Sequence, residues 1–185
     1  MTDPEAERRT APRVLVVCRE RDDDQARVNE LVTAAFAKGP DEPGTLEAEL
    51  VEALRICPDW IPELSMVAEA DGVVVGHVLC SRGRVAGRPV LALGPLAVEP
   101  AYQGLGVGTA LVHAVIGAGD AMGEPLVVLL GHLDYYPRFG FVPGTSLGVT
   151  PPEAAWGDHF QVRPLTTYDP SLRGLFAYAE PFNGL

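Results

Sequence analysis

The chain has 185 residues, of which 47% are hydrophobic, enough for one domain with a substantial core. Its formal net charge of −11 argues against nucleic-acid binding, because contacts to phosphates need a basic surface. No apolar run is long enough to span a membrane, and the charged start MTDPEAERRTAP lacks the apolar core of a secretory signal. The acidity serves either solubility or the attraction of cationic substrates such as amines.

The three cysteines, Cys18, Cys57 and Cys80, are too far apart for a CxxC pair or for the spacing of zinc ligands. Reduced thiols are the simple interpretation, and they predict a cytoplasmic protein without a metal site. Nothing beside Cys80 in the sequence would activate it as a nucleophile, so we expect a small buried side chain there.

Residues 1–12 are rich in charge and proline and are expected to form a flexible arm, followed by a single domain over residues 13–165. The apolar run RVLVVC at 13–18 predicts a strand. Apolar side chains at helical spacing over residues 28–36 predict a helix, and a second helix is expected over residues 46–55.

Three strands are expected next, over residues 64–70, 73–82 and 90–98, and they form an antiparallel meander. Asp71-Gly72 is a typical hairpin turn between the first two. The third strand contains Gly94-Pro95, which predicts either a bulge or a strand that begins only at Leu96.

A helix is expected from Gly106 to Gly119 or Gly123, followed by a buried strand over residues 126–130. The order strand, helix, strand implies a parallel crossover. A last strand is expected over residues 159–165. The tail at 166–185 is apolar, so it is expected to pack on the domain or on a partner, where it could form a homodimer contact.

The stretch QGLGVG at 103–108 places glycines where a helix should begin. Unpaired N–H groups at a helix N-terminus attract anions, and glycines let a phosphate approach the backbone. A P-loop is excluded because the stretch has no lysine, and a Rossmann loop would need a small residue where Thr109 stands. A pyrophosphate loop of the form [QR]xxGx[GA] fits Gln103, Gly106 and Gly108.

With this loop, LAVEPAYQGLGVGTAL at 96–111 resembles the strand, loop and helix of GNAT N-acetyltransferases. YPRFGF at 136–141 is similar to the Y-x-x-x-G-F element of the same family, and the double tyrosine resembles a branch of bacterial predicted acetyltransferases. The resemblance implies an α/β fold of the α+β type. Its mixed, mostly antiparallel sheet would have helices on both faces and a parallel pair of strands splayed at the cofactor site.

The resemblance also implies acetyl-CoA as co-substrate, without a metal. The backbone of residues 96–98 would pair with the pantetheine arm, and the N–H groups of residues 103–109 would hold the pyrophosphate. The expected cofactor-binding residues are Leu96, Ala97, Val98, Gln103, Gly104, Leu105, Gly106, Val107, Gly108 and Thr109. Leu105 departs from the family pattern, because many members have a basic residue there.

By the same resemblance, Tyr136 is the acid that donates a proton to the leaving thiolate, with Tyr135 as the neighbouring alternative. GHLD at 131–134 stands where many members have an asparagine. The base that deprotonates the amine is left open among five residues: Glu69, His77, Glu99, His132 and Asp134. Of these, His77 is expected in the core, and Glu99 is expected to cap the turn before the helix.

The sequence therefore predicts an acetyl-CoA-dependent N-acetyltransferase that acts on a primary amine of a small molecule or a peptide. The alternative is a non-catalytic acyl-CoA-binding module on the same fold. The resemblance does not distinguish between acceptor amines. Neither a nucleic acid nor a membrane is expected as a partner.

Overall fold

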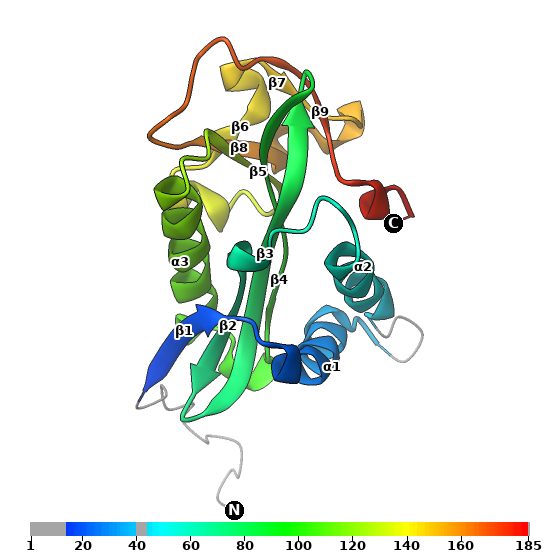
Figure 1. Ribbon diagram of the computed structural model, residues 1–185, viewed down its shortest axis with the longest axis vertical. Coiled ribbons are helices and arrows are strands. Elements are labelled where there is room, and N and C mark those ends of the chain that lie inside the picture. The colour runs from blue at the N-terminus through cyan, green and yellow to red at the C-terminus, as the bar shows by residue number, and fades with distance from the viewer. Residues whose placement is uncertain (1–13, 40–43, 185) are drawn as a thin grey trace, which may run out of the picture.

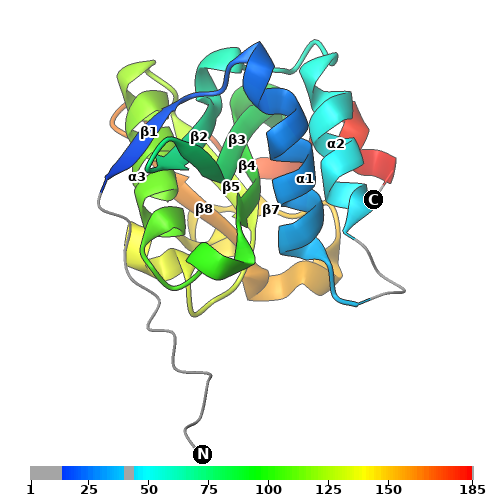
Figure 2. The ribbon, with the colours of Figure 1, turned by 90° about the horizontal axis from the view of Figure 1, so that it is seen from below.

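The computed structural model describes residues 14–39 and 44–184, so the arm expected at residues 1–12 lies outside the described residues. Figure 1 shows a central sheet with α3 (Val107–Ala121) on one face and α1 (Gln25–Phe36) and α2 (Thr45–Arg55) on the other. Figure 2 shows the same layers from below. Within the described ranges, no helix is long and apolar enough to cross a membrane.

The main sheet has the strand order β1-β2-β3-β4-β5-β8-β6, and only its β4–β5 pair is parallel. Two short strands, β7 and β9, lie off this path, and β9 joins the sheet at the far end of β3. The bounds are β1 (Leu15–Arg19), β2 (Ser65–Ala70), β3 (Val73–Val85), β4 (Arg88–Val98), β5 (Leu126–Leu130), β6 (Val142–Pro143), β7 (Val149–Thr150), β8 (Phe160–Pro164) and β9 (Gly174–Ala177). The expected meander is the β2–β3–β4 part of this sheet.

The two faces of the sheet bury separate apolar clusters, because side chains alternate along each strand. On β3, Val78 and Cys80 pack in the cluster that contains the buried residues of α3. Leu79, between them, packs in the cluster that contains the buried residues of α1 and α2. Val78 and Leu79 are fully buried, as expected for a strand covered on both faces.

Both turns of the meander have two residues in the left-handed region. Asp71 and Gly72 have φ values of 50° and 85°, and Ala86 and Gly87 have φ values of 48° and 81°. Two successive positive φ values are typical of the hairpin turns that match the twist of antiparallel strands. The hairpin predicted at Asp71-Gly72 is confirmed, while β3 runs three residues further than expected, to Val85.

A β-bulge interrupts β4 beside the glycine loop. Val78 of β3 pairs with Leu96 and Cys80 pairs with Leu93, so two residues of β4 lie opposite one residue of β3. The two bulged residues of β4 are Gly94 and Pro95, which lie opposite Leu79. The bulge interpretation is therefore confirmed, and a strand that begins only at Leu96 is wrong because β4 starts at Arg88.

Beyond the bulge, β4 and β5 diverge. Their parallel pairing is limited to Leu91 with Val127 and Ala92 with Val128. The last residues of β4 keep their pairing with β3 but have lost their neighbour on the other side. This is the splayed parallel pair that the family resemblance implies, and it opens a gap next to the N-terminus of α3.

The tail after residue 165 packs within the chain. Ala177 and Phe176 of β9 pair with Arg84 and Val85 of β3, and both Phe176 and Leu172 are fully buried. Burial of one such side chain contributes about 1.5–3 kcal/mol. The homodimer contact stays a prediction, although these apolar side chains already have partners in their own chain.

Candidate active site

The glycine loop connects the end of β4 to the start of α3. A short 3-10 turn at Pro100–Tyr102 follows Val98, and α3 begins at Val107. Gly104 and Gly106 have φ values of 78° and 89°, in the left-handed region that disfavours residues with a Cβ atom. Two glycines of the stretch are therefore needed for the shape of the loop itself.

The loop presents N–H groups without backbone partners. Among the described residues, the N–H groups of Gly104 and of residues 106–109 make no backbone hydrogen bond. The first intrahelical bond at this end runs from the Ala110 N–H to the Gly106 carbonyl, at 3.0 Å. These N–H groups carry the partial positive charge of the helix N-terminus, so an anion of the size of a phosphate fits their chemistry.

A cavity of about 530 Å³ lies over this loop. It is lined by β4, the loop, the start of α3 and the 131–138 segment, with these residues: Leu96, Val98, Tyr102, Gln103, Gly104, Gly106, Gly108, Thr109, His132, Tyr135, Tyr136 and Arg138. Seven of the ten expected cofactor-binding residues are in this set. Ala97 and Val107 are buried on opposite sides of the sheet, and Leu105 does not line the cavity.

The splayed edge of β4 is already partly hydrogen-bonded. The Gln103 side chain donates a hydrogen bond from Nε2 to the carbonyl oxygen of Val98, at 3.0 Å. Gln103 thereby ties the loop to the strand that leads into it. A carbonyl oxygen can accept a second hydrogen bond, so this contact is compatible with a ligand that lies along the strand.

The two neighbouring tyrosines occupy different places. Tyr135 lies at the helix end, where its hydroxyl interacts with Thr109 and would lie 2.7 Å from a Cβ atom at Gly108. The guanidinium carbon of Arg138 lies 4.7 Å from the centre of the Tyr135 ring, a cation–π distance. Burial raises the pKa of Tyr135, and Thr109 and Arg138 oppose that shift.

Tyr136 lies in the gap between the diverging strands. Its ring packs against Gly131, where a Cβ atom would lie only 2.2 Å from the ring carbon Cε2. Burial, followed by the nearby Tyr135 and Cys80, raises the pKa of Tyr136 well above its usual range. The phenol therefore keeps its proton at neutral pH. Burial likewise raises the pKa of the Cys80 thiol, which fits the expected small buried residue and argues against a thiolate nucleophile.

Tyr136 also lines a second cavity, of about 490 Å³, which includes side chains of α1, α2 and the C-terminal tail. Leu96 and His132 line both cavities as well. The gap between β4 and β5 thus has one cavity at the glycine loop and another toward α1 and α2, with a protonated phenol where they meet. This arrangement can bring two ligands to one proton donor.

Four of the five candidate bases lie elsewhere. Glu69 contacts Cys18 and Arg21 on the outer part of the sheet, and the Asp134 side chain lines neither cavity. Glu99 is the N-cap residue of the Pro100–Tyr102 turn, as expected, but its side chain makes no capping bond and forms an ion pair with Arg27 at 2.5 Å. His132 remains as the only one of the five that lines the cavities.

His77 is in the core, as the sequence predicts, within a buried polar cluster. Its Nε2 lies 3.0 Å from the Ser65 hydroxyl, and Ser65 and Arg55 both donate hydrogen bonds to Glu20. Burial lowers the pKa of His77, so it is neutral at pH 7. Burial opposes ionisation of Glu20, but its interactions with His77, followed by the Ser65 hydrogen bond and the Arg55 charge, outweigh that effect and lower its pKa to about 2.

Two charged residues at the cavities were missed in the sequence. Arg138, inside the YPRFGF motif, lines the cavity over the glycine loop, and Glu47 of α2 lines the second cavity. Arg138 could have been predicted from its position inside the motif. Glu47 could not, because only the packing of α2 brings it to the gap.

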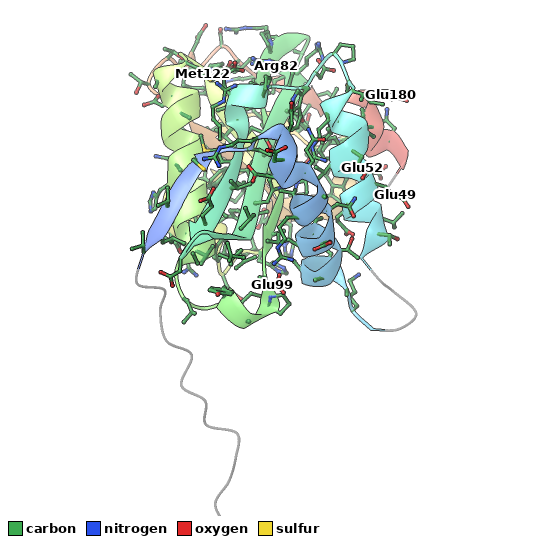
Figure 3. The ribbon with its side chains drawn as sticks, turned by 60° about the horizontal axis from the view of Figure 1, so that its bottom comes forward. Glu49, Glu52, Arg82, Glu99, Met122 and Glu180 are labelled. Carbon is green, nitrogen blue, oxygen red and sulfur yellow. The ribbon has the colours of Figure 1, made fainter. Side chains whose placement is uncertain are left out.

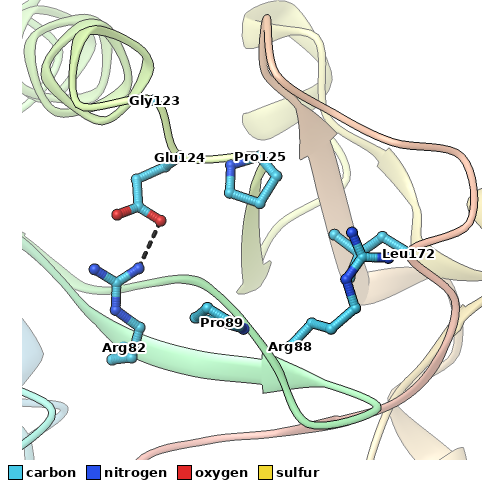
Figure 4. Close-up of a pocket in the computed structure, with 7 residues that line it drawn as sticks. All are labelled: Arg82, Arg88, Pro89, Gly123, Glu124, Pro125 and Leu172. Carbon is cyan, nitrogen blue, oxygen red and sulfur yellow. Dashed lines mark hydrogen bonds and ion pairs between the residues drawn. The ribbon is translucent and has the colours of Figure 1, made fainter.

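Another cavity, of about 500 Å³, lies at the opposite end of β4, where Arg82 and Arg88 face it (Figure 4). Arg82 is paired with Glu124 at 2.5 Å, and Arg88 contacts Ser171 and Asp169. Both guanidinium groups therefore have partners within the chain.

Across residues 14–39 and 44–184, no group of three or more His, Cys, Asp or Glu side chains is arranged to hold a metal ion.

Comparison with known proteins supports the family resemblance that the two sequence motifs indicate. Residues 28–141 match the model of the acetyltransferase (GNAT) family. The chain is 35% identical over 166 residues to the uncharacterized N-acetyltransferase YjhQ of Escherichia coli, with 85% of this chain and 88% of YjhQ covered. It is 34% identical over 143 residues to YhbS of the same organism, covering 74% and 83% of the two chains.

Solved structures extend the likeness to the fold. The crystal structure of Escherichia coli YhbS in complex with CoA has a TM-score of 0.80 at 28% identity and covers 99% of this chain and 96% of its own. A GNAT acetyltransferase of Brucella melitensis in complex with acetyl-CoA has a TM-score of 0.71 at 32% identity, covering 91% and 98% of the two chains. Together with the splayed strands and the glycine loop, these matches show that the chain belongs to the GNAT acetyltransferase family.

Proposed function

We propose that the chain transfers an acetyl group from acetyl-CoA to the primary amine of a small acceptor. One observation carries the proposal: two cavities meet at the phenol of Tyr136, and one of them lies over the unpaired N–H groups of the glycine loop. The relatives crystallised with CoA and acetyl-CoA support acetyl-CoA as the ligand at this loop.

The pyrophosphate of acetyl-CoA is proposed to bind the N–H groups of Gly104 and residues 106–109. The pantetheine arm would then lie along Leu96 and Val98, at the edge of β4 that has no neighbour after the bulge. Arg138 lines the same cavity, so we propose that it supplies the positive charge that Leu105 cannot. This assignment lets an acidic chain bind an anionic ligand through local contacts.

In the proposed reaction, the neutral amine attacks the thioester carbonyl, a C–N bond forms and the C–S bond breaks. The nitrogen loses one proton in net terms and the leaving sulfur gains one. Tyr136 lies where the two cavities meet and is protonated at neutral pH, so it is proposed to donate a hydrogen bond to the developing thiolate. The Tyr135 hydroxyl lies beside Gly108 and interacts with Thr109, at the proposed phosphate end, which favours Tyr136 in this role.

The first test is calorimetric titration with acetyl-CoA, beside NADH on the same sample. We expect acetyl-CoA alone to bind. Gly106→Glu should weaken binding strongly, because the substitution adds negative charge and a Cβ atom at a φ of 89°. Gly123→Glu is the matched control: Gly123 has a φ of 79° and equally open space, but lies at the other end of α3.

A thiol-release assay with an amine panel then separates catalysis from mere binding. Turnover that falls in Tyr136→Phe supports the proposal. Tight acetyl-CoA binding without turnover of any amine would favour the alternative, a non-catalytic acyl-CoA-binding module. Equal loss of acetyl-CoA binding in the Gly106 and Gly123 variants would contradict the assignment of the glycine loop.

A further inference from the structure

The second cavity has an unusual lining. It lies toward α1 and α2, and its walls come from the bulge of β4, the end of β5, both helices and the C-terminal tail. Its five aromatic side chains come from four separate segments, two of them from the C-terminal tail: Phe36, Tyr136, Trp156, Tyr178 and Phe182. All five are partly exposed, so their rings are accessible to a ligand.

Three of these rings contact one another. Trp156 and Tyr178 have ring centres 6.0 Å apart at an interplanar angle of 70°, and Tyr178 and Phe182 have ring centres 4.5 Å apart at 31°. Such edge-to-face and tilted contacts are the favoured geometries of aromatic pairs. Phe182 also packs on the core cluster of α1 and α2. The C-terminal turn that contains it, Glu180–Gly184, lies beside α2 (Figure 1). The tail therefore forms a firm wall of the cavity.

The lining of the second cavity has few charged side chains. Glu47 is its only carboxylate, and no lysine or arginine is among the lining residues. In the part of the chain that the structure describes, Glu47 makes no hydrogen bond or ion pair with its side chain, although it is only partly exposed. His132 is the only other titratable group of the lining apart from the tyrosines.

We infer that this cavity binds the acceptor and that the acceptor is an aromatic monoamine, one ring on a short chain that ends in a primary amine. The inference rests on the proposed function and names its substrate class. Rings stack on aromatic walls, and an ammonium group is attracted both by Glu47 and by the ring faces. A volume of about 490 Å³ is within the range of small-molecule sites.

The same lining disfavours other amines. A polyamine would bring several positive charges to a cavity with one carboxylate, and each unpaired charge would lose hydration without a partner. A peptide would need partners for its backbone groups, whereas most of the lining is apolar or aromatic. A single amine with an aromatic body matches both the charge and the walls.

The experiment compares 2-phenylethylamine, n-butylamine and spermidine as acceptors in the thiol-release assay. We expect kcat/KM to be at least about tenfold higher for 2-phenylethylamine than for either of the others. Glu47→Gln should raise KM for 2-phenylethylamine by about tenfold and leave KM for acetyl-CoA unchanged. Glu49→Gln is the matched control, an exposed glutamate on the same helix that does not line the cavity (Figure 3).

Phe182→Ala provides a second variant, expected to raise KM for 2-phenylethylamine and not for n-butylamine, which has no ring to stack. Preference for spermidine, or equal kinetics in the Glu47 and Glu49 variants, would overturn the inference and leave the proposed function intact. A protein that binds acetyl-CoA and acetylates none of the three amines also overturns it. Failure to bind acetyl-CoA at all would instead refute the proposed function.

Discussion

The contact between Gly131 and Tyr136 allows the proposed acid to be moved without being removed. A Cβ atom at position 131 would lie 2.2 Å from Cε2 and 2.5 Å from Cδ2 of the Tyr136 ring. Non-bonded carbon atoms pack at about 3.5–4.0 Å, so the ring of Gly131→Ala has to shift by more than about 1 Å. Gly131 is not at a positive φ, so the backbone itself accepts alanine.

A displacement of about 1 Å in a catalytic group can cost about 10²-fold in rate, which corresponds to about 3 kcal/mol of activation free energy. We therefore expect Gly131→Ala to lower kcat by about two orders of magnitude. The dissociation constant of acetyl-CoA should change little, because the glycine loop is untouched. Calorimetry and steady-state kinetics with the best acceptor measure the two quantities separately.

Gly117→Ala is the control for an added methyl group, because Gly117 lies in α3 with open space around its Cβ position. It should leave both kcat and acetyl-CoA binding unchanged. The reasoning is refuted if Gly131→Ala turns over at the rate of the parent chain. It is equally refuted if the loss appears only as weaker acetyl-CoA binding, because Tyr136 would then act in binding rather than in proton donation.

Three further predictions follow from particular contacts. Tyr136→Phe should lower kcat by about 10²–10⁴-fold, whereas Tyr135→Phe should mainly alter acetyl-CoA binding through Thr109, as kinetics and calorimetry of the pair would reveal. Gly83→Ala places a Cβ atom 2.6 Å from Phe176 and should destabilise the chain by about 1–3 kcal/mol in denaturant titrations; unchanged stability would mean that the tail adapts. Glu20, whose pKa is lowered from 4.5 to about 2, should stabilise the fold above pH 4.5 and lose this contribution as the pH falls toward 2. Glu20→Gln should flatten that part of the stability profile.

Features with a local cause were predictable from the sequence. The alternation and spacing of apolar residues predicted the helices and most strands to within about three residues, and the glycines of the loop marked the start of α3. Gly94-Pro95 indicated the bulge, because proline cannot donate in a ladder and glycine weakens a strand. The assignment of His77 to the core followed from its place in the middle of a strand and is confirmed by its complete burial.

Features that depend on packing between distant segments were not predictable in this way. Glu47 looks like an ordinary first-turn glutamate of an amphipathic helix, and nothing near it in sequence points to a cavity. Trp156 and Phe182 belong to segments that read as a loop and a tail. The tail reaches the gap beside Tyr136 after β9 has paired with the end of β3 and with β7. The aromatic wall is thus a consequence of tertiary structure alone.

The acidity of the chain acts differently on the two proposed ligands. A net charge of −11 repels an anion at long range, but this effect is screened over about 8 Å at physiological salt, whereas N–H groups act at contact distance. Binding at the glycine loop can therefore tolerate the overall charge. A cationic amine is attracted by the same charge and meets Glu47 in a cavity without lysine or arginine. Higher salt should then weaken capture of the amine, because screening reduces the attraction by distant carboxylates, while acetyl-CoA association loses a repulsion. We therefore expect the KM of the amine to rise with salt and the KM of acetyl-CoA to fall. Opposite changes of this kind would indicate that the surface charge favours binding of the acceptor.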